Sequence, residues 1–266
     1  MRMRVCAVVV LAAGLVWAPL SGGASSAAPL PSARAIQQAP SGVPNLMGSW
    51  APSSGRGADA KLAPPPAGPL VLKPEYAKAF EARRAADAEA TRRGEPLPSA
   101  GMLCSPYGMP RMMAVATYPM EILQTPGQVT IIAEAFSEVR RIYLNRAQEP
   151  IDDVPPGYYG HSVGRWEGET LVVDTVGIKE SVPGYNSMPH SRQMRITERF
   201  KLMAADVLFD EITIQDPVVL EKPVTYTRAY RRLPDYEMVE FVCENNREYV
   251  DAEGKVRMRL PGKVGQ

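Results

Sequence analysis

After Leu103, apolar and polar residues alternate with a period of two, and turn-forming residues interrupt the alternation at short intervals. This period places successive side chains on opposite faces of a strand, so each run predicts a half-buried β-strand. The runs are 121–124, 129–136, 139–144, 161–166, 170–176, 194–202, 207–214, 224–232 and 238–243. About eight or nine strands at this spacing favour a mainly β fold, an antiparallel barrel or sandwich.

Other signals complete a single domain over residues 45–266. Asn45–Trp50 predicts a first short strand, Pro126-Gly127 suits a type II turn, and Gly168 lies in a tight hairpin turn. Residues 74–93 predict one surface helix, because a proline opens the segment, alanine is frequent and Gly94 can end it.

The N-terminus has the pattern of a secretory signal peptide. Arg2 and Arg4 precede an apolar run over 5–18 that is too short to span a bilayer, and small residues then allow cleavage after Ala24 or Ala27. We therefore expect a signal peptide over 1–27, a flexible tether over 28–44, and export to the periplasm or beyond. Cleavage takes the formal net charge of +1 to about −1, which does not favour nucleic acid, and no second run approaches membrane-spanning length.

Two cysteines, Cys104 and Cys243, remain after this cleavage. An even number of cysteines in an oxidising compartment predicts a disulfide. It would close a loop of about 140 residues and stabilise the fold by roughly 4 kcal/mol on the chain-entropy model.

One charged residue departs from the alternation. Glu198 shares a strand face with apolar residues, so its carboxyl points inward and has either a raised pKa, as in a general acid or base, or a cationic partner. Arg228 is a possible partner, because Tyr226, Arg228 and Tyr230 also share one face. Asp174 is a further candidate, but both faces of its strand are apolar and its direction stays open.

The chain has only two histidines, His161 and His190, and each could carry protons near neutral pH. No metal-ligand spacing, nucleophile elbow or nucleotide-binding glycine loop accompanies them, so neither a metal nor a cofactor is expected. Tyr226, Tyr230, Arg228, Arg111 and Trp166 are candidates for gripping a carboxylate or phenolate ligand. A sheet face that is half exposed to solvent would give the same pattern.

Two stretches carry a resemblance. Residues 160–168 (GHSVGRWEG) and 170–177 (TLVVDTVG) resemble a signature of secreted bacterial proteins of uncharacterised function. Residues 189–191, 197–200 and 242–245 and the segment around Cys104 look like other parts of that signature, which implies export but no particular activity.

Gly48-Ser49-Trp50 is similar to the GxW motif of lipocalins, in which the tryptophan closes the bottom of the barrel. The resemblance implies a barrel that binds hydrophobic small molecules. Phenolic acid decarboxylases, on a similar barrel, use tyrosine, arginine and glutamate without a cofactor, an analogy at the level of fold.

Three hypotheses for the function follow, of which the first two involve an aromatic or terpenoid small molecule in the barrel. The first is a lyase or isomerase in which Glu198 and His161 carry protons while Tyr226 and Arg228 hold an anionic group. The second is a non-catalytic carrier, and the third is an envelope protein with a filled barrel. His190 and Asp174 are further catalytic candidates, while Arg111, Tyr230 and Trp166 would contact the ligand; the oligomeric state cannot be predicted from the sequence.

Overall fold

The computed structural model describes residues 42–53, 63–94, 104–114, 118–243, 248–251, 253–254 and 256–258. The predicted signal peptide and the tether up to residue 41 lie outside the described residues. Within the described part of the chain, no helix is long and apolar enough to cross a membrane.

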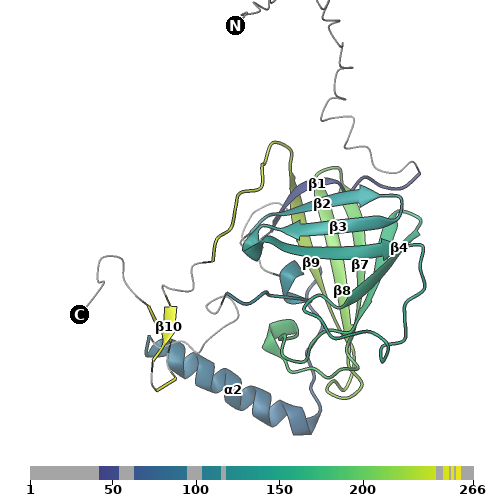
Figure 1. The fold of residues 1–266 in the computed structure, drawn as a ribbon. Helices are drawn as coiled ribbons and strands as arrows, with labels where there is room; N and C mark the ends of the chain where they lie inside the picture. The colour runs from purple at the N-terminus through teal and green to yellow at the C-terminus, as the bar shows by residue number, and fades with distance from the viewer. Residues whose placement is uncertain are drawn as a thin grey trace, which may run out of the picture. The chain divides into compact units, whose positions relative to one another are not determined.

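Nine strands form a closed barrel in which neighbours follow chain order and β9 pairs with β1 to complete the ring (Figure 1). The strands are β1 Gly48–Pro52, β2 Met120–Thr125, β3 Gln128–Ala133, β4 Glu138–Leu144, β5 His161–Glu167, β6 Thr170–Val176, β7 Arg195–Ala204, β8 Val207–Gln215 and β9 Val224–Leu233. The predicted β-barrel is therefore confirmed, and the sandwich is not what forms.

One neighbouring pair in the ring is parallel, namely β4 and β5, in which Ile142 is the partner of Ser162. A closed ring of nine strands cannot alternate direction throughout, because nine is odd. The segment 145–160 runs back along the barrel before β5 begins, so this connection is a crossover rather than the hairpin expected for an antiparallel barrel.

Two turn expectations have different outcomes. Gly168 has a left-handed φ of 59°, as a tight β5–β6 hairpin turn requires. Gly127 joins β2 to β3 without a left-handed φ, so this turn is not of type II.

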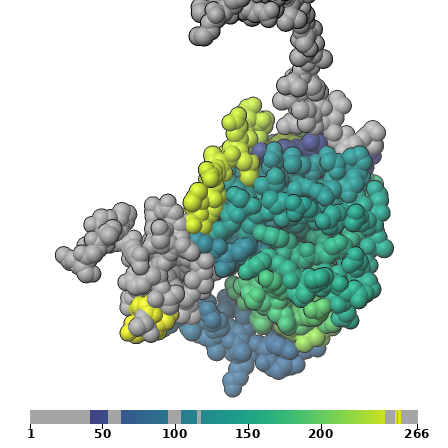
Figure 2. All heavy atoms as spheres, in the orientation of Figure 1, coloured from purple at the N-terminus to yellow at the C-terminus, as the bar shows by residue number. Residues whose placement is uncertain are grey.

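The predicted strand at 238–243 does not form. Residues 234–243 instead form a segment without strand pairing that lies against the barrel surface (Figure 2). Its backbone N–H at Val239 donates to the carboxylate of Glu134 (3.3 Å), the Tyr236 hydroxyl donates to the same carboxylate, and the Phe241 ring lies 4.8 Å from that of Phe136.

The helix α2 spans Pro74–Arg92, one residue shorter than predicted. Its residues are mostly exposed, while Phe80 and Ala90 are buried. A further small sheet consists of β10 Glu248–Val250 and β11 Val256–Met258.

Trp50 is fully buried, as a tryptophan that closes one end of a barrel must be. Its indole N–H donates to the Leu46 carbonyl (2.8 Å), and the Arg232 guanidinium lies 4.2 Å from the ring centroid. The interior beyond it is one continuous apolar cluster that includes Ile122, Ile142, Phe200 and Ile212, together with Met109, Met112 and Met113 from the segment 104–114.

Candidate functional site

The centre of the barrel holds a closed ion pair between Arg140 on β4 and Glu198 on β7, whose side chains are both 0% exposed. The guanidinium donates to both carboxylate oxygens, at 2.8 Å in one case. It also donates to the hydroxyls of Ser162 (3.2 Å) and Thr175 (3.0 Å). Glu198 therefore points inward as predicted, but its partner is Arg140 rather than Arg228.

A second buried carboxylate, Asp210 on β8, has no such partner. Asp210 is 0% exposed, and neither of its oxygens has a hydrogen-bond partner among the described residues. It stands opposite Arg228 on β9 and opposite Phe200 on β7. Burial, with a smaller contribution from the charge of Glu198, raises the pKa of Asp210 well above that of an ordinary aspartate.

A pocket of about 380 Å³ opens beside this region of the interior. Its lining residues are Tyr107, Pro110, Arg111, Ala114, Gly184, Tyr185, Asn186, Ser187, Tyr226 and Arg228. None of these described residues carries a carboxylate, and two of them are arginines. We call it the mouth pocket, because its loops lie at the end of the barrel where β8 ends and β9 begins, opposite the Trp50 end.

The barrel wall supplies Tyr226 and Arg228. Both face inward on β9, where alternation puts Val224, Tyr226, Arg228 and Tyr230 on one side. The Tyr226 hydroxyl and the Arg228 Nε are buried and have no hydrogen-bond partner within the described structure. Burial raises the pKa of Tyr226, so its hydroxyl remains a donor.

The loop 177–194 supplies the facing wall. Tyr185 stacks on Tyr226 with ring centroids 4.1 Å apart and planes 16° from parallel. His190 is buried in the same loop, and its Nε2 lies 2.7 Å from the Val182 carbonyl. Ser191 follows it and bonds through its N–H and hydroxyl (2.6 and 2.8 Å) to the Asp216 carboxylate. His190 therefore anchors this loop and does not line the pocket.

The segment 104–114 forms the third wall. The Cys104–Cys243 disulfide, which confirms the predicted pairing, fixes its start, and Tyr230 donates to the Met113 carbonyl (2.6 Å) near its end. Between them, the Gly108 N–H donates to the buried Glu138 carboxylate (3.2 Å). Arg111 is held with its guanidinium 5.0 Å from the centroid of the Tyr107 ring. A covalent bond and several hydrogen bonds thus set the position of Arg111.

Three further predicted site residues also lie away from this pocket, as Glu198 and His190 do. His161 begins β5 on the outer face, where its Nδ1 lies 3.2 Å from the Gln148 side-chain nitrogen. Asp174 also faces outward and accepts hydrogen bonds from Arg165 (2.7 Å) and Thr197 (2.8 Å), which resolves its direction. Trp166 packs against the core and does not line the mouth pocket.

Of the predicted residues, Tyr226, Arg228 and Arg111 therefore meet at one pocket, and Tyr230 supports it from behind. The most informative residue that the sequence analysis missed is Asp210. The signal was present, because Asp210 interrupts the apolar series Leu208, Ile212 and Ile214 on one strand face, just as Glu198 does on its own strand.

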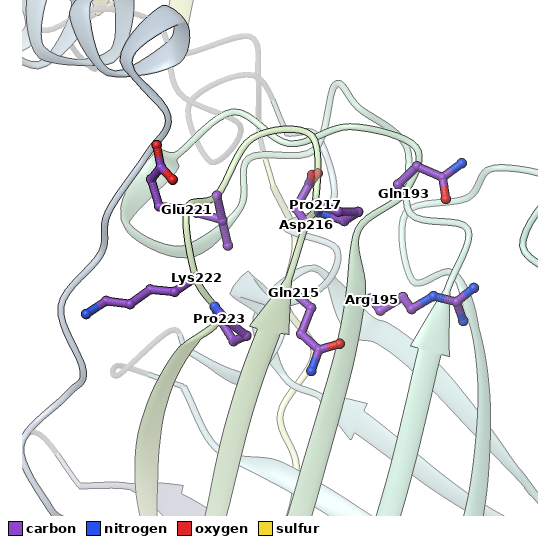
Figure 3. Close-up of a pocket in the computed structure, with 9 residues that line it drawn as sticks. Gln193, Arg195, Gln215, Asp216, Pro217, Glu221, Lys222 and Pro223 are labelled. Atoms are coloured by element: carbon purple, nitrogen blue, oxygen red, sulfur yellow. The ribbon is translucent and has the colours of Figure 1, made fainter.

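A larger hollow, of about 460 Å³, lies outside the barrel at the start of β7 and the end of β8 (Figure 3). Arg195 and Gln215 line it from the outer face, and Lys222 and Glu221 extend from the following loop. The labelled side chains in Figure 3 point in different directions rather than toward one centre. This hollow therefore lacks the convergent polar groups that fix a small ligand.

No family model matches the sequence, and a search of curated proteins finds no match. Among solved structures, the chain is similar to the fatty acid transporter REP1-NXSQ, with 13% identity, a TM-score of 0.33, and coverage of 72% of this chain and 98% of that chain. It is also similar to a mutant of the fluorescent protein UnaG, with 16% identity, a TM-score of 0.28, and coverage of 45% and 73%. At these values the likenesses do not bear on what this chain binds.

Proposed function

We propose that this protein is a carrier whose mouth pocket binds a small aromatic anion and releases it chemically unchanged. The observation that carries the proposal is Arg228, a half-buried cation whose Nε has no hydrogen-bond partner within the described structure, on a pocket wall that includes no carboxylate. The guanidinium lies 5.4 Å from the centroid of the Tyr226 ring, but no described anionic group bonds to it, and a carboxylate, sulfonate or phenolate would satisfy it.

The aromatic lining supports a flat ligand body. Tyr107, Tyr185 and Tyr226 line a space of about 380 Å³, which is within the range usual for small-molecule pockets. The Tyr226 hydroxyl is available as a donor, and Arg111 offers a second positive charge at the rim. This combination favours a planar molecule with one acidic group over an uncharged terpenoid or a long aliphatic chain.

Two placements favour binding over acid–base chemistry. The Glu198 carboxylate is fully buried in its ion pair with Arg140 and does not line the mouth pocket, so a ligand there does not contact it. His161 lies on the outer face of the barrel. We retain export as part of the proposal, so that the carrier would work outside the cytoplasm.

The test uses naphthalene-2-sulfonate as the probe, with naphthalene-2-sulfonamide as its uncharged counterpart of nearly equal shape. Calorimetric titration should give tight binding of the sulfonate and weak binding of the sulfonamide. Replacing Arg228 by Gln should weaken sulfonate binding by about tenfold to a hundredfold, the range expected for a charged hydrogen bond of about 1.5–3 kcal/mol.

Arg199→Gln is the matched control, because Arg199 lies on the outer face of β7 and pairs with Glu167 at the surface. It should leave sulfonate affinity unchanged. Equal losses in the two variants, or equal affinity for the two probes, would refute anion recognition by Arg228. Substrate-like phenolic acids incubated with the protein should be recovered intact by mass spectrometry, and their conversion would refute the carrier function.

A further inference from the structure

We infer that Asp210 determines the charge of the molecule that the mouth pocket accepts, because its carboxyl holds a proton and so leaves Arg228 uncompensated for a bound anion. The inference rests on the proposed function and adds to it a specificity-determining residue and a mechanism of regulation. It implies that anion binding is coupled to proton binding.

The position of Asp210 is the first step. Its partner across the β8–β9 ladder is Arg228, so the two side chains leave the barrel wall on the same face at neighbouring positions. Arg228 in turn lines the mouth pocket, whereas Asp210 is fully buried and does not. Asp210 therefore acts on a ligand through Arg228 and is a positioning residue rather than a contact.

Charged and titratable side chains from four strands, β4, β7, β8 and β9, surround Asp210. Arg140 on β4 and Glu198 on β7 form an ion pair without net charge; the Glu198 charge raises the pKa of Asp210, and the Arg140 charge lowers it by less. Strand β9 contributes Arg228 and the hydroxyls of Tyr226 and Tyr230, and burial raises the pKa of both tyrosines. On β8 itself, the neighbouring Glu211 is on the outer face, opposite Thr227. Arg228 is then the only remaining inward cation near Asp210 among the described residues.

The missing hydrogen bond is the second step. An ionised carboxylate beside a guanidinium normally accepts hydrogen bonds from it, because an unpaired buried charge is costly. Asp210 accepts none, and the Arg228 Nε donates none. Protonation of Asp210 fits both observations, because burying a neutral acid without a hydrogen bond costs far less free energy than burying an unpaired carboxylate. Burial and the nearby charge of Glu198 raise the pKa of Asp210 by more than Arg140 and Arg228 lower it.

Coupling follows from this arrangement. An anion bound to Arg228 brings a negative charge near Asp210 and disfavours its ionisation, so the pKa of Asp210 rises further on binding. By reciprocity, affinity is highest while Asp210 is protonated and falls as the pH rises through its pKa in the free protein. Above that pKa, the ionised Asp210 and the ligand compete for the same guanidinium.

The experiment measures naphthalene-2-sulfonate binding by calorimetry from about pH 5 to about pH 9, a range over which the sulfonate stays ionised. In the wild type, affinity should fall by up to about tenfold per pH unit above the pKa of Asp210. Titrations in buffers of different ionisation enthalpy should show up to one proton taken up per probe. Asp210→Asn mimics the protonated acid, so its affinity should stay at the low-pH wild-type value throughout, with no proton uptake.

Asp174→Asn is the control, since Asp174 is a carboxylate on the outer face that should not change the pH profile. The inference is overturned if the wild type shows neither a slope nor proton uptake, or if Asp210→Asn keeps the wild-type slope, which would assign it to another group such as a histidine. If either of these results is obtained while Arg228→Gln still weakens sulfonate binding, only the role of Asp210 is refuted and the proposed function stands. If Arg228→Gln binds the sulfonate as tightly as the wild type does, both the inference and the proposed function are refuted.

Discussion

Asp210 and Arg228 stand opposite each other on neighbouring strands, yet no hydrogen bond joins them. An acid and a base that share a face on neighbouring strands usually form an ion pair. In this barrel the buried ion pair forms between Arg140 and Glu198 instead, and Arg228 lines the mouth pocket. We therefore assign Arg140 and Glu198 to the structural core and Arg228, with Asp210 beside it, to the proposed binding site.

The buried acid has a consequence for stability. Since the folded-state pKa of Asp210 is raised, the folded protein holds a proton that the unfolded chain releases near pH 4. Its contribution to stability is therefore fully present below about pH 4 and is lost as the pH rises through the folded-state pKa. Asp210→Asn should remove this decline, so that the free energy of unfolding of the variant exceeds that of the wild type increasingly toward high pH.

Urea unfolding at several pH values measures this difference. A wild type whose stability rises with pH relative to Asp210→Asn would show that Asp210 is ionised in the folded protein.

Neutralising Glu198 in the central ion pair should destabilise the protein, whereas neutralising Asp210 should stabilise it. Glu198→Gln leaves the Arg140 guanidinium buried without a counter-charge, and we expect the free energy of unfolding to fall by about 3–5 kcal/mol. Replacing both residues together, Arg140→Met with Glu198→Leu, should cost less than Glu198→Gln alone, because no unpaired charge remains.

Chemical denaturation of these variants provides the measurement. Glu167→Gln is the control, since Glu167 forms its ion pairs at the surface and should contribute less than about 1 kcal/mol. If Glu198→Gln were no more damaging than Glu167→Gln, the pair would not be a buried structural element.

The alternation in the sequence was enough to predict the barrel, because it records which side chains face inward on each strand. It placed Glu198, Tyr226 and Arg228 inside correctly. It could not orient Asp174, since other parts of the chain cover both faces of β6 in places: Val176 on the outer face packs with Ile151 and Val154. Periodicity describes one strand and carries no information about what packs on it.

Contacts between residues far apart in the sequence could not be predicted for the same reason. Arg140 and Glu198 are 58 residues apart, and they meet only because the ring closes with β4 and β7 on facing sides. The disulfide is the exception, since the two cysteines outside the predicted signal peptide allow only one pairing. The parallel β4–β5 pair also escaped prediction, because turn residues in 145–160 resemble those of ordinary hairpins.

The disulfide should stabilise both the fold and the pocket. Replacing Cys104 and Cys243 together by Ser should lower the free energy of unfolding by about 2–5 kcal/mol. It should also weaken naphthalene-2-sulfonate binding, because the segment that carries Tyr107 and Arg111 is no longer tied at its start. Thermal unfolding and calorimetry measure the two effects.

Reduction of the wild type with a thiol reagent should reproduce both effects, and the same reagent should have no effect on the double Ser variant. A double variant as stable as the wild type would show that the hydrogen bonds of Gly108 and Met113 suffice to hold the segment.

Gly108 should be the least replaceable residue of this segment. It has a φ of 63°, and a Cβ added there would lie 2.5 Å from the Tyr158 carbonyl oxygen. Gly108→Ala should therefore destabilise the protein by about 1–3 kcal/mol and weaken sulfonate binding. Gly127→Ala is the control in thermal unfolding, because nothing lies within 4 Å of its added Cβ, and equal melting temperatures for the two variants would contradict the strained fit.

The most direct test of the central claim is a crystal structure of the protein with naphthalene-2-sulfonate. We predict the sulfonate within hydrogen-bond distance, about 3 Å, of the Arg228 guanidinium and the naphthalene ring against Tyr226 and Tyr185. A probe bound instead in the outer hollow beside Arg195 and Lys222, or a mouth pocket left empty at saturating probe, would contradict the account.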